Sequence, residues 1–390
     1  MKIGIDISQT AFPGTGVAIY TQNLVENLLK IDQENEYFLF FSSLRGQNQK
    51  SIHSTSSGLI LSKVEVSKIK NQNYNSKIKN YIFPPLFLEF LWNRVHTLPV
   101  DWLTGELDVF HTSDWLEPPS RCPKVTTIHD LAIFKYPETF VPRGGHNIVE
   151  NMKRKLAWVK KESRLIIAVS ENTKRDIVEV LGIPEDRIRV VYEAADEIFS
   201  KQYSVNSIQP IKKKYGIEGK YILAVGTREP RKNIDRVIEA HNLLISQYPD
   251  LSLVIAGKFG WGEEKLKIKN EKLKILGYVP KEDLAPLYAG AECFVYPSLY
   301  EGFGLPVLEA MSSRCPVVTS NASSLPEVAG NAAVLVNPEN IEDIAGGIER
   351  AMENRTELIK KGLTRAKEFS WEKTARQTLK IYEEVYADRN

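Results

Sequence analysis

One segment, residues 297–311, constrains the fold more than any other, because it joins a strand pattern, a glycine-bearing turn and a helix start. It follows the apolar run 293–296, which predicts a buried strand. The turn carries Glu301 with glycines after it, and Pro306 suits the first helical position. Unpaired backbone N–H groups and the helix dipole favour a phosphate at such a helix start. Glu309 falls about one turn into the helix, where a carboxylate can accept hydrogen bonds from paired sugar hydroxyls.

Strand and helix patterns alternate along the chain, which predicts an α/β fold with parallel sheets. The first series runs from a strand at residues 2–7 to a last strand at 189–192, and the second begins at the apolar run 221–226. At 390 residues, the chain is expected to form two domains. Each half is expected to be a doubly wound parallel sheet.

A polar stretch at residues 196–218 lacks a clear period, and we interpret it as the linker or its approach. We therefore predict one domain over residues 1–200 and another over residues 214–370. Ligands of open α/β sheets bind at the carboxyl ends of the strands. Two such sheets facing each other would form a cleft, and the motifs described here all follow predicted strands.

Composition argues against several classes of protein. The net charge is only +2, which gives no support for nucleic-acid binding. The cysteines, at 122, 293 and 315, have neither metal-ligand spacing nor the pattern of a disulfide framework, which fits a reducing cytoplasm. The first apolar run is too short for a secretory signal and contains Asp6. No stretch is long and apolar enough to span a bilayer.

The apolar run 82–92 has two interpretations. Basic residues precede it, at Lys68, Lys70, Lys77 and Lys79. It can be a patch that docks on a membrane surface or a lipid-linked acceptor. It can equally be a helix packed into the first domain, behind a polar loop at about residues 46–81, and the interrupting prolines favour this second interpretation.

A block of cations follows the first strand of the second series. Gly226 ends that strand, and Arg228, Arg231 and Lys232 gather before a predicted helix start. Positive charge at a helix start is unfavourable to the dipole, which favours a functional role over a surface cluster. Cations fixed in a dry cleft would stabilise the charge that a leaving diphosphate gains in the transition state.

Two candidate sites lie in the first half. Gly14 and Gly16 link the first strand to a helix, and small residues there allow close approach of a substrate, although a plain turn is a fair alternative. His129 and Asp130 end a buried strand. The histidine can bind a sugar hydroxyl or be structural, and His111, at the end of a neighbouring strand, is the more structural of the two.

Together these motifs resemble the retaining nucleotide-sugar glycosyltransferases of family 4, in the order that the family has them. The Glu-x7-Glu spacing of Glu301 and Glu309 alone would be weak support. The other blocks that carry the resemblance are Gly14–Gly16, His129–Asp130, Ser170–Thr173, Gly226–Asn233 and Gly277–Val279. The resemblance implies the GT-B fold, with an acceptor-binding first domain, a donor-binding second domain and a last helix, within residues 371–390, that packs back on the first.

The resemblance also implies roles for individual residues. Arg231 and Lys232 would bind the diphosphate, Glu301 the reacting sugar or acceptor, and Glu309 the ribose. His129 would bind a donor-sugar hydroxyl, and Asp130 would orient it or bind acceptor. Main-chain contacts to the donor are expected from Gly14, Gly16, Gly226, Tyr278, Val279, Gly302, Phe303, Gly304 and Leu305. Many members carry arginine where this chain has Thr227, which leaves the role of Arg228 open.

The resulting prediction is a cytoplasmic glycosyltransferase, either free or peripheral at the inner membrane, that moves a hexose from a nucleotide diphosphate sugar to a saccharide or lipid-linked acceptor. The blocks around His129 and Lys232 resemble mannosyltransferases of bacterial polysaccharide synthesis, so GDP-mannose is favoured over a UDP-sugar. Because no Asp-x-Asp pair occurs, we expect no metal cofactor. A nucleotide-sugar epimerase and a non-catalytic sugar-nucleotide-binding protein are the alternatives.

Overall fold

The computed structural model describes residues 1–12, 14–43, 76–140, 148–258 and 271–388, which form two compact units. Unit 1 comprises Met1–Phe134, Pro142–Glu193 and Trp371–Asn390, and unit 2 comprises Lys135–Val141 and Ala194–Ser370. Each unit is a parallel sheet covered by helices, as the sequence predicts. The expected cleft concerns how the two units face each other and stays a prediction.

Unit 1 is built on a parallel sheet of seven described strands in the order β3-β2-β1-β4-β5-β6-β7. The order reverses between β1 and β4, so the chain leaves the sheet centre in opposite directions there. The strands are β1 (Lys2–Asp6), β2 (Glu36–Ser42), β3 (Ser76–Tyr81), β4 (Val109–Ser113), β5 (Lys124–Ile128), β6 (Ser163–Ala168) and β7 (Ile188–Val190).

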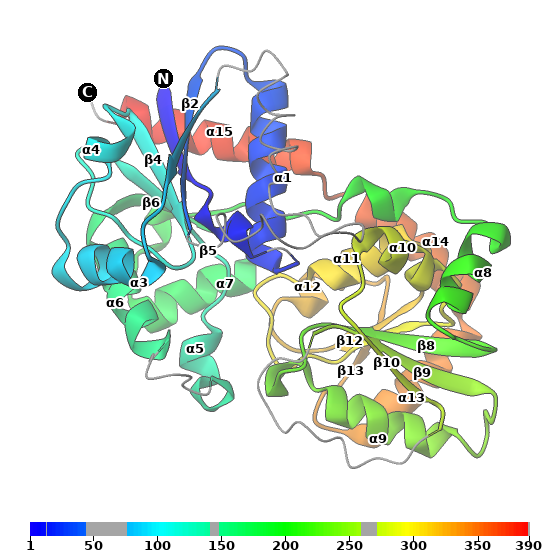
Figure 1. Cartoon of the computed structure of the whole chain (residues 1–390). Coiled ribbons are helices and arrows are strands. Elements are labelled where there is room, and N and C mark those ends of the chain that lie inside the picture. The colour runs from blue at the N-terminus through cyan, green and yellow to red at the C-terminus, as the bar shows by residue number, and fades with distance from the viewer. Residues whose placement is uncertain (13, 44–75, 141–147, 259–270, 389–390) are drawn as a thin grey trace. The chain divides into compact units, whose positions relative to one another are not determined.

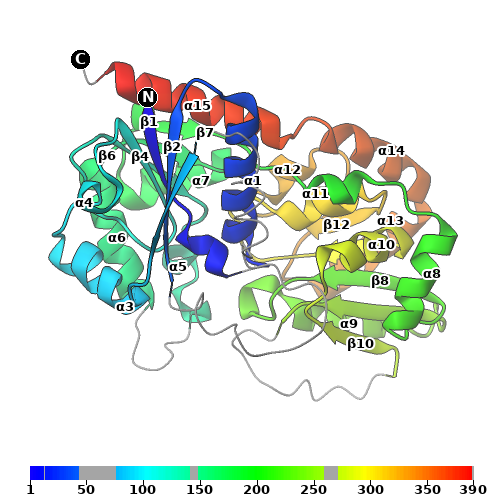
Figure 2. The same ribbon diagram turned by 45° about the horizontal axis from the view of Figure 1, so that its top comes forward.

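Helices cover both faces of this sheet (Figures 1 and 2). Side chains alternate between the two faces along β4 and β5. His111 and Thr127 bond to Tyr382 of α15 and Tyr20 of α1, whereas Thr112 and Thr126 bond to each other, and Thr112 also donates to Glu117. The helices are α1 (Gly16–Ile31), α3 (Pro85–Leu88), α4 (Asp101–Thr104), α5 (Ala132–Lys135), α6 (Ile148–Glu162), α7 (Glu171–Asp176) and α15 (Trp371–Ala387).

The last helix, α15, belongs to unit 1, as predicted, and lies beside α1. His111 joins it to the sheet, with Nδ1 2.6 Å from the Tyr382 hydroxyl and Nε2 2.8 Å from Thr127 Oγ1. Burial lowers the pKa of His111 to about 3, so the ring is neutral. His111 is therefore structural, as the sequence analysis favours.

Unit 2 is built on a parallel sheet of six described strands in the order β10-β9-β8-β11-β12-β13, which reverses between β8 and β11. Helices α9 and α13 cover one face and contribute to one apolar core, while α8, α10 and α11 lie on the other (Figure 1). The strands are β8 (Lys220–Val225), β9 (Leu251–Ala256), β10 (Leu273–Gly277), β11 (Phe294–Tyr296), β12 (Val317–Ser320) and β13 (Val334–Val336). The helices are α8 (Val205–Lys214), α9 (Ile234–Leu244), α10 (Lys281–Gly290), α11 (Leu305–Ser312), α12 (Leu325–Ala329), α13 (Ile341–Glu353) and α14 (Arg355–Ala366).

Three local predictions differ from the structure. The predicted linker contains a helix, α8, which packs on α10. Its lysine-rich sequence obscures the apolar residues that would indicate a helix. Helix α11 begins at Leu305, so Pro306 is its second residue. The end of the polar loop at residues 46–81 forms β3, paired with β2, and residues 44–75, with Lys68 and Lys70, lie outside the described part of the chain.

The apolar segment near residue 90 packs into unit 1, as the second interpretation predicts, whereas its contact with a membrane stays a prediction. Leu88 and Trp92 are buried in a core with Phe40 and Phe110 of the sheet. The opposite side of the segment is exposed, with Ile82, Leu86, Phe87, Phe90 and Val95 each near half of their full accessibility. No helix in the described residues has the length and apolarity needed to cross a bilayer.

Replacing Tyr382 with phenylalanine is expected to destabilise unit 1, because it leaves a buried nitrogen of His111 without its partner. The expected cost is about 1–3 kcal/mol, seen as a lower thermal midpoint in calorimetry. Tyr386→Phe, at a partly exposed position one turn later on α15, is the matched control. Equal midpoints for the two variants would contradict the anchoring role of this hydrogen bond.

Candidate functional site

The strongest candidate site lies where the strand order of unit 2 reverses, at the carboxyl ends of β8 and β11. Ligands of doubly wound sheets bind at such a reversal. The loops after the two strands are joined: Leu299 N donates to Arg231 O at 2.9 Å, and Asn233 Nδ2 donates to Pro297 O at 2.9 Å. Two motifs that are about 70 residues apart in sequence thus form one rigid edge.

Two cations and one carboxylate meet at this edge. Lys232 Nζ lies 2.7 Å from Glu301 Oε1, and Arg231 Nη1 lies 3.0 Å from Glu301 Oε2. Arg231 also pairs with Glu229 at 2.6 Å. Arg231 and Glu301 are less than a tenth exposed. The structure therefore brings Arg231, Lys232 and Glu301 together, as the sequence predicts for a diphosphate-sugar site.

Neutral groups complete the surroundings of Glu301. The hydroxyls of Tyr296 and Ser298 both donate to Glu301 Oε1, at 2.8 Å and 2.6 Å. Burial alone would raise the pKa of Glu301, but Arg231 and Lys232 outweigh it and lower the pKa to about 2. Glu301 is therefore ionised at any physiological pH and is a weak base.

Two glycines give this edge its shape. Gly226 has φ 147°, and the stem of Lys232 passes 3.6–3.8 Å from the position where a side chain at Gly226 would begin. Gly304, with φ 113°, is the N-cap of α11, and a Cβ there would lie 2.7 Å from Leu325. Both positions lie in the positive-φ region that favours glycine. Leu305 begins α11, and Gly302 and Phe303 lie in the turn before it.

Glu309 lies in the second turn of α11 and is buried, with the Tyr288 hydroxyl donating to its Oε2 at 3.2 Å. Burial raises the pKa of Glu309 to about 7, and this hydrogen bond only partly offsets the effect. Hydroxyl donors would stabilise the ionised form of this buried carboxylate, because each hydrogen bond to the ionised form lowers its pKa. The position suits the predicted contact with a ribose.

The predicted donor contacts Tyr278, Val279 and Arg228 also lie on unit 2. Tyr278 is exposed after β10, with Lys258 Nζ 4.7 Å from the centre of its ring, and Val279 is buried. Arg228 is partly buried, and its backbone N–H bonds to Lys258 O at 3.0 Å. Among the described residues, no group of three or more His, Cys, Asp or Glu side chains could hold a metal ion.

In unit 1, His129 follows β5 with Nδ1 3.2 Å from Glu193 Oε1, and its ring meets Tyr20 edge-on. Asp130 accepts a hydrogen bond from Ala132 N at 2.9 Å, so it also supports the start of α5. Gly14 has φ 81°, a conformation that favours glycine because glycine lacks a Cβ atom. A Cβ on Gly16, the first residue of α1, would meet nothing within 4 Å.

Several polar residues were not predicted from the sequence. Tyr296 and Tyr288 lie within apolar runs that predict core, so nothing marks their hydroxyls as polar partners of Glu301 and Glu309. Lys155, a buried lysine of α6 in unit 1, was not predicted either, although the sequence places it on the apolar face of that helix, between Met152 and Val159 at helical spacing.

Family models support what this geometry suggests. The model of glycosyl transferases group 1 matches residues 207–369, which hold the Arg231–Lys232–Glu301 cluster, and the model of glycosyltransferase family 4 matches residues 14–197, which hold His129. The fold, with two Rossmann-like units, and these matches define a glycosyltransferase.

Similar proteins narrow the class. O-antigen chain mannosyltransferase B of Escherichia coli is 32% identical over 398 residues, covering 98% of this chain and 99% of that protein. The serotype-specific mannosyltransferase WbdA of E. coli is 34% identical over 267 residues, covering 64% of this chain and 32% of its own. The crystal structure of Anabaena HepE in complex with UDP and glucose shares the fold, with TM-score 0.68 at 17% identity over 98% of this chain and 100% of that one. The chain belongs to glycosyltransferase family 4.

The ion pairs of Glu301 predict a specific pH dependence of stability. Its folded-state pKa of about 2 lies below the ordinary 4.5, so the stabilisation, roughly 3 kcal/mol, is present above pH 4.5 and lost as the pH falls toward 2. Glu301→Gln should therefore lower the thermal midpoint at pH 7, and its difference from the unmodified protein should narrow between pH 5 and pH 3. Glu339→Gln, at an exposed carboxylate of unit 2, is the control. A difference that stays constant over this pH range would show that ionisation of Glu301 does not contribute to stability.

Proposed function

We propose that the chain transfers a mannosyl residue from GDP-mannose to a hydroxyl of a saccharide or lipid-linked acceptor, with retention of anomeric configuration, in polysaccharide or glycolipid assembly. The observation that carries the proposal is the buried cluster of Arg231, Lys232 and Glu301 at the strand reversal of unit 2. The names of the relatives, O-antigen chain mannosyltransferase B and WbdA, support the choice of sugar and pathway.

Lys232 and Arg231 would stabilise the leaving diphosphate. As the sugar–phosphate bond breaks, negative charge grows on the β-phosphate, and cations fixed in a buried site gain most at that moment. Their charges are balanced by Glu301 before a donor arrives, which keeps two buried cations from being unpaired. With this pair available, we propose that the reaction needs no metal ion.

Glu301 would hold the sugar without attacking it. Its two carboxylate oxygens bond to Lys232, Arg231 and neighbouring hydroxyls, and its pKa of about 2 makes it a poor base. We propose front-face transfer: the acceptor oxygen bonds to the anomeric carbon, the bond from that carbon to phosphate breaks, and the acceptor proton passes to the departing phosphate oxygen.

A UDP-sugar is the second candidate donor, because HepE, which shares the fold, was crystallised with UDP and glucose. A panel of radiolabelled nucleotide sugars with a mannosylated acceptor tests the choice. Consumption of GDP-mannose with label in the acceptor is expected. Consumption of UDP-sugars alone contradicts the donor, release of an epimerised sugar nucleotide without transfer indicates an epimerase, and tight binding without turnover indicates a binding protein.

In the same assay, Lys232→Met should lower kcat by about 100-fold or more, because a fixed donor to developing charge is lost. Glu309→Ala should weaken GDP binding. Lys220→Met removes an exposed lysine at the amino edge of the same sheet and is the matched control. If Lys232→Met turns over as fast as Lys220→Met, the proposed role of the cation is wrong.

We also propose that the exposed face of α3 and of the π-helical segment that follows it (Glu89–Val95), with Leu86, Phe87 and Phe90, contacts the cytoplasmic face of an anionic membrane. Arg94 lies at this face, 6.0 Å from the centre of the Phe90 ring, and apolar side chains beside a cation suit anionic headgroups. The cysteines Cys122, Cys293 and Cys315 are buried and free, which fits a reducing compartment.

Sedimentation with vesicles tests this surface. Binding to phosphatidylglycerol vesicles should exceed binding to phosphatidylcholine vesicles, and Phe87→Ser with Phe90→Ser should abolish it without changing the thermal midpoint. Leu243→Ser, at an equally exposed apolar residue of α9, is the control. Equal binding by the double variant would contradict the assignment.

A further inference from the structure

A second group of charged residues lies where the strand order of unit 1 reverses. β1 ends at Asp6, and Asp114 directly follows β4, its neighbour in the sheet. Asp114 is partly exposed and has φ 59°, a conformation that Asp tolerates better than most residues. By the same rule that applies to unit 2, a ligand is expected at this reversal.

Helix α6 places a buried lysine beneath this edge. Lys155 is 1% exposed, and the carboxylates that act on it electrostatically are Glu117, Asp114 and Asp6. No hydrogen bond or ion pair joins its ammonium to any residue in the described part of the chain. Burial lowers the pKa of Lys155 in spite of these carboxylates, so the surroundings destabilise its charge.

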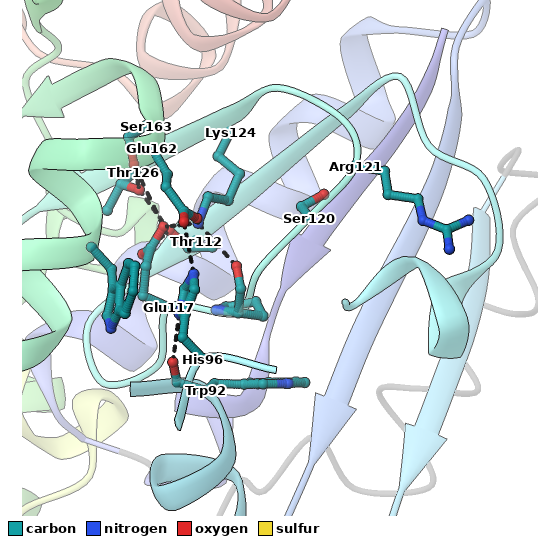
Figure 3. Close-up of polar contacts among 12 residues, drawn as sticks. Trp92, His96, Thr112, Glu117, Ser120, Arg121, Lys124, Thr126, Glu162 and Ser163 are labelled. Carbon is teal, nitrogen blue, oxygen red and sulfur yellow. Dashed lines mark hydrogen bonds and ion pairs between the residues drawn. The ribbon is translucent and has the colours of Figure 1, made fainter. Parts of the chain in front are cut away.

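Glu117 makes no direct hydrogen bond or ion pair with Lys155, and other groups engage its carboxylate. Figure 3 shows its carboxylate between Lys124, 2.9 Å from Oε1, and Thr112, which donates to Oε2 at 2.8 Å. Lys124 in turn pairs with Glu162 at 2.8 Å, and Glu162 pairs with His96. This network is complete by itself and leaves Lys155 as a cation without a direct counterpart.

The turn that carries Asp114 is held rigidly against α6. Asn93 Nδ2 donates to Trp115 O at 2.7 Å and to Asn151 Oδ1 at 2.9 Å, and Asn93 Oδ1 accepts from Glu117 N at 2.9 Å. Asn151 lies one turn before Lys155 on the same helix. The positions of Asp114 and Lys155 are therefore fixed relative to each other before any ligand binds, as a preorganised site requires.

We propose that Asp114 and Lys155 form the acceptor subsite, and that it takes the hydroxyl groups of an uncharged sugar. This inference rests on the transferase activity proposed above. A hydroxyl both donates and accepts, so it can donate to the carboxylate and accept from the ammonium at once. A phosphorylated sugar is disfavoured, because Asp130 adds negative charge near Asp114, Asp6 adds it near Lys155, and Lys124 is already paired with Glu117.

Ligand-observed saturation-transfer NMR on the full chain tests the subsite directly, with methyl α-mannoside and mannose 6-phosphate as probes, with and without GDP. The unmodified protein should bind methyl α-mannoside and not mannose 6-phosphate. Asp114→Asn and Lys155→Met should each weaken glycoside binding by about tenfold or more, since each removes a charged hydrogen-bond partner. GDP binding should be unchanged in both.

Matched controls separate binding from structure. Lys153→Met removes an exposed lysine of the same helix, and Asp186→Asn removes an exposed carboxylate at the other edge of the sheet. Lys155→Met should keep or raise the thermal midpoint, because it removes a cation that its surroundings destabilise, whereas a structural ion pair would predict a lower one. Unchanged glycoside affinity in both site variants, or tighter binding of mannose 6-phosphate, would overturn the subsite. If the unmodified protein binds methyl α-mannoside but does not turn over GDP-mannose, the proposed function is wrong and the subsite is not contradicted.

Discussion

The pairing of Glu301 with Arg231 and Lys232 is the interaction on which the second unit's functional edge depends. Three charges are held in a site nearly closed to water, and each would be costly there alone. The same residues hold the loops together, because Arg231 bonds through its backbone and its guanidinium to the segment that carries Glu301. The proposed binding chemistry and the local structure therefore depend on the same contacts.

The two units differ in how the charged side chains at their strand reversals are paired. Both place charged side chains at the carboxyl ends of central strands where the strand order reverses. In unit 2 the charges are paired within hydrogen-bond distance, and an anionic ligand would have to compete with Glu301. In unit 1 the pairing stops at Glu117 and Lys124, and Lys155 remains without a direct partner. A buried charge of this kind lowers stability, and such a cost is consistent with the proposed role of Lys155 in binding an acceptor.

How much of this could be predicted depended on where each residue stands in the strand–helix pattern. Lys232 and Glu301 were predictable because each follows a strand in a glycine-bearing loop. Tyr296 was not, because its ring completes an apolar strand and only the fold brings its hydroxyl to Glu301. Helix α8 was missed because its lysines dominate its composition and Pro210 lies inside it. Lys155 was missed because a lysine on a helix is usually solvated, although its spacing places it on the apolar face.

A crystal structure of the protein with GDP bound would test the central claim most directly. The account predicts that Lys232 Nζ lies within hydrogen-bond distance of a β-phosphate oxygen, beside the amides at the start of α11. It also predicts that Glu301 keeps its contact with Arg231. A diphosphate bound elsewhere, with Lys232 still paired only to Glu301 and Tyr296, would contradict it.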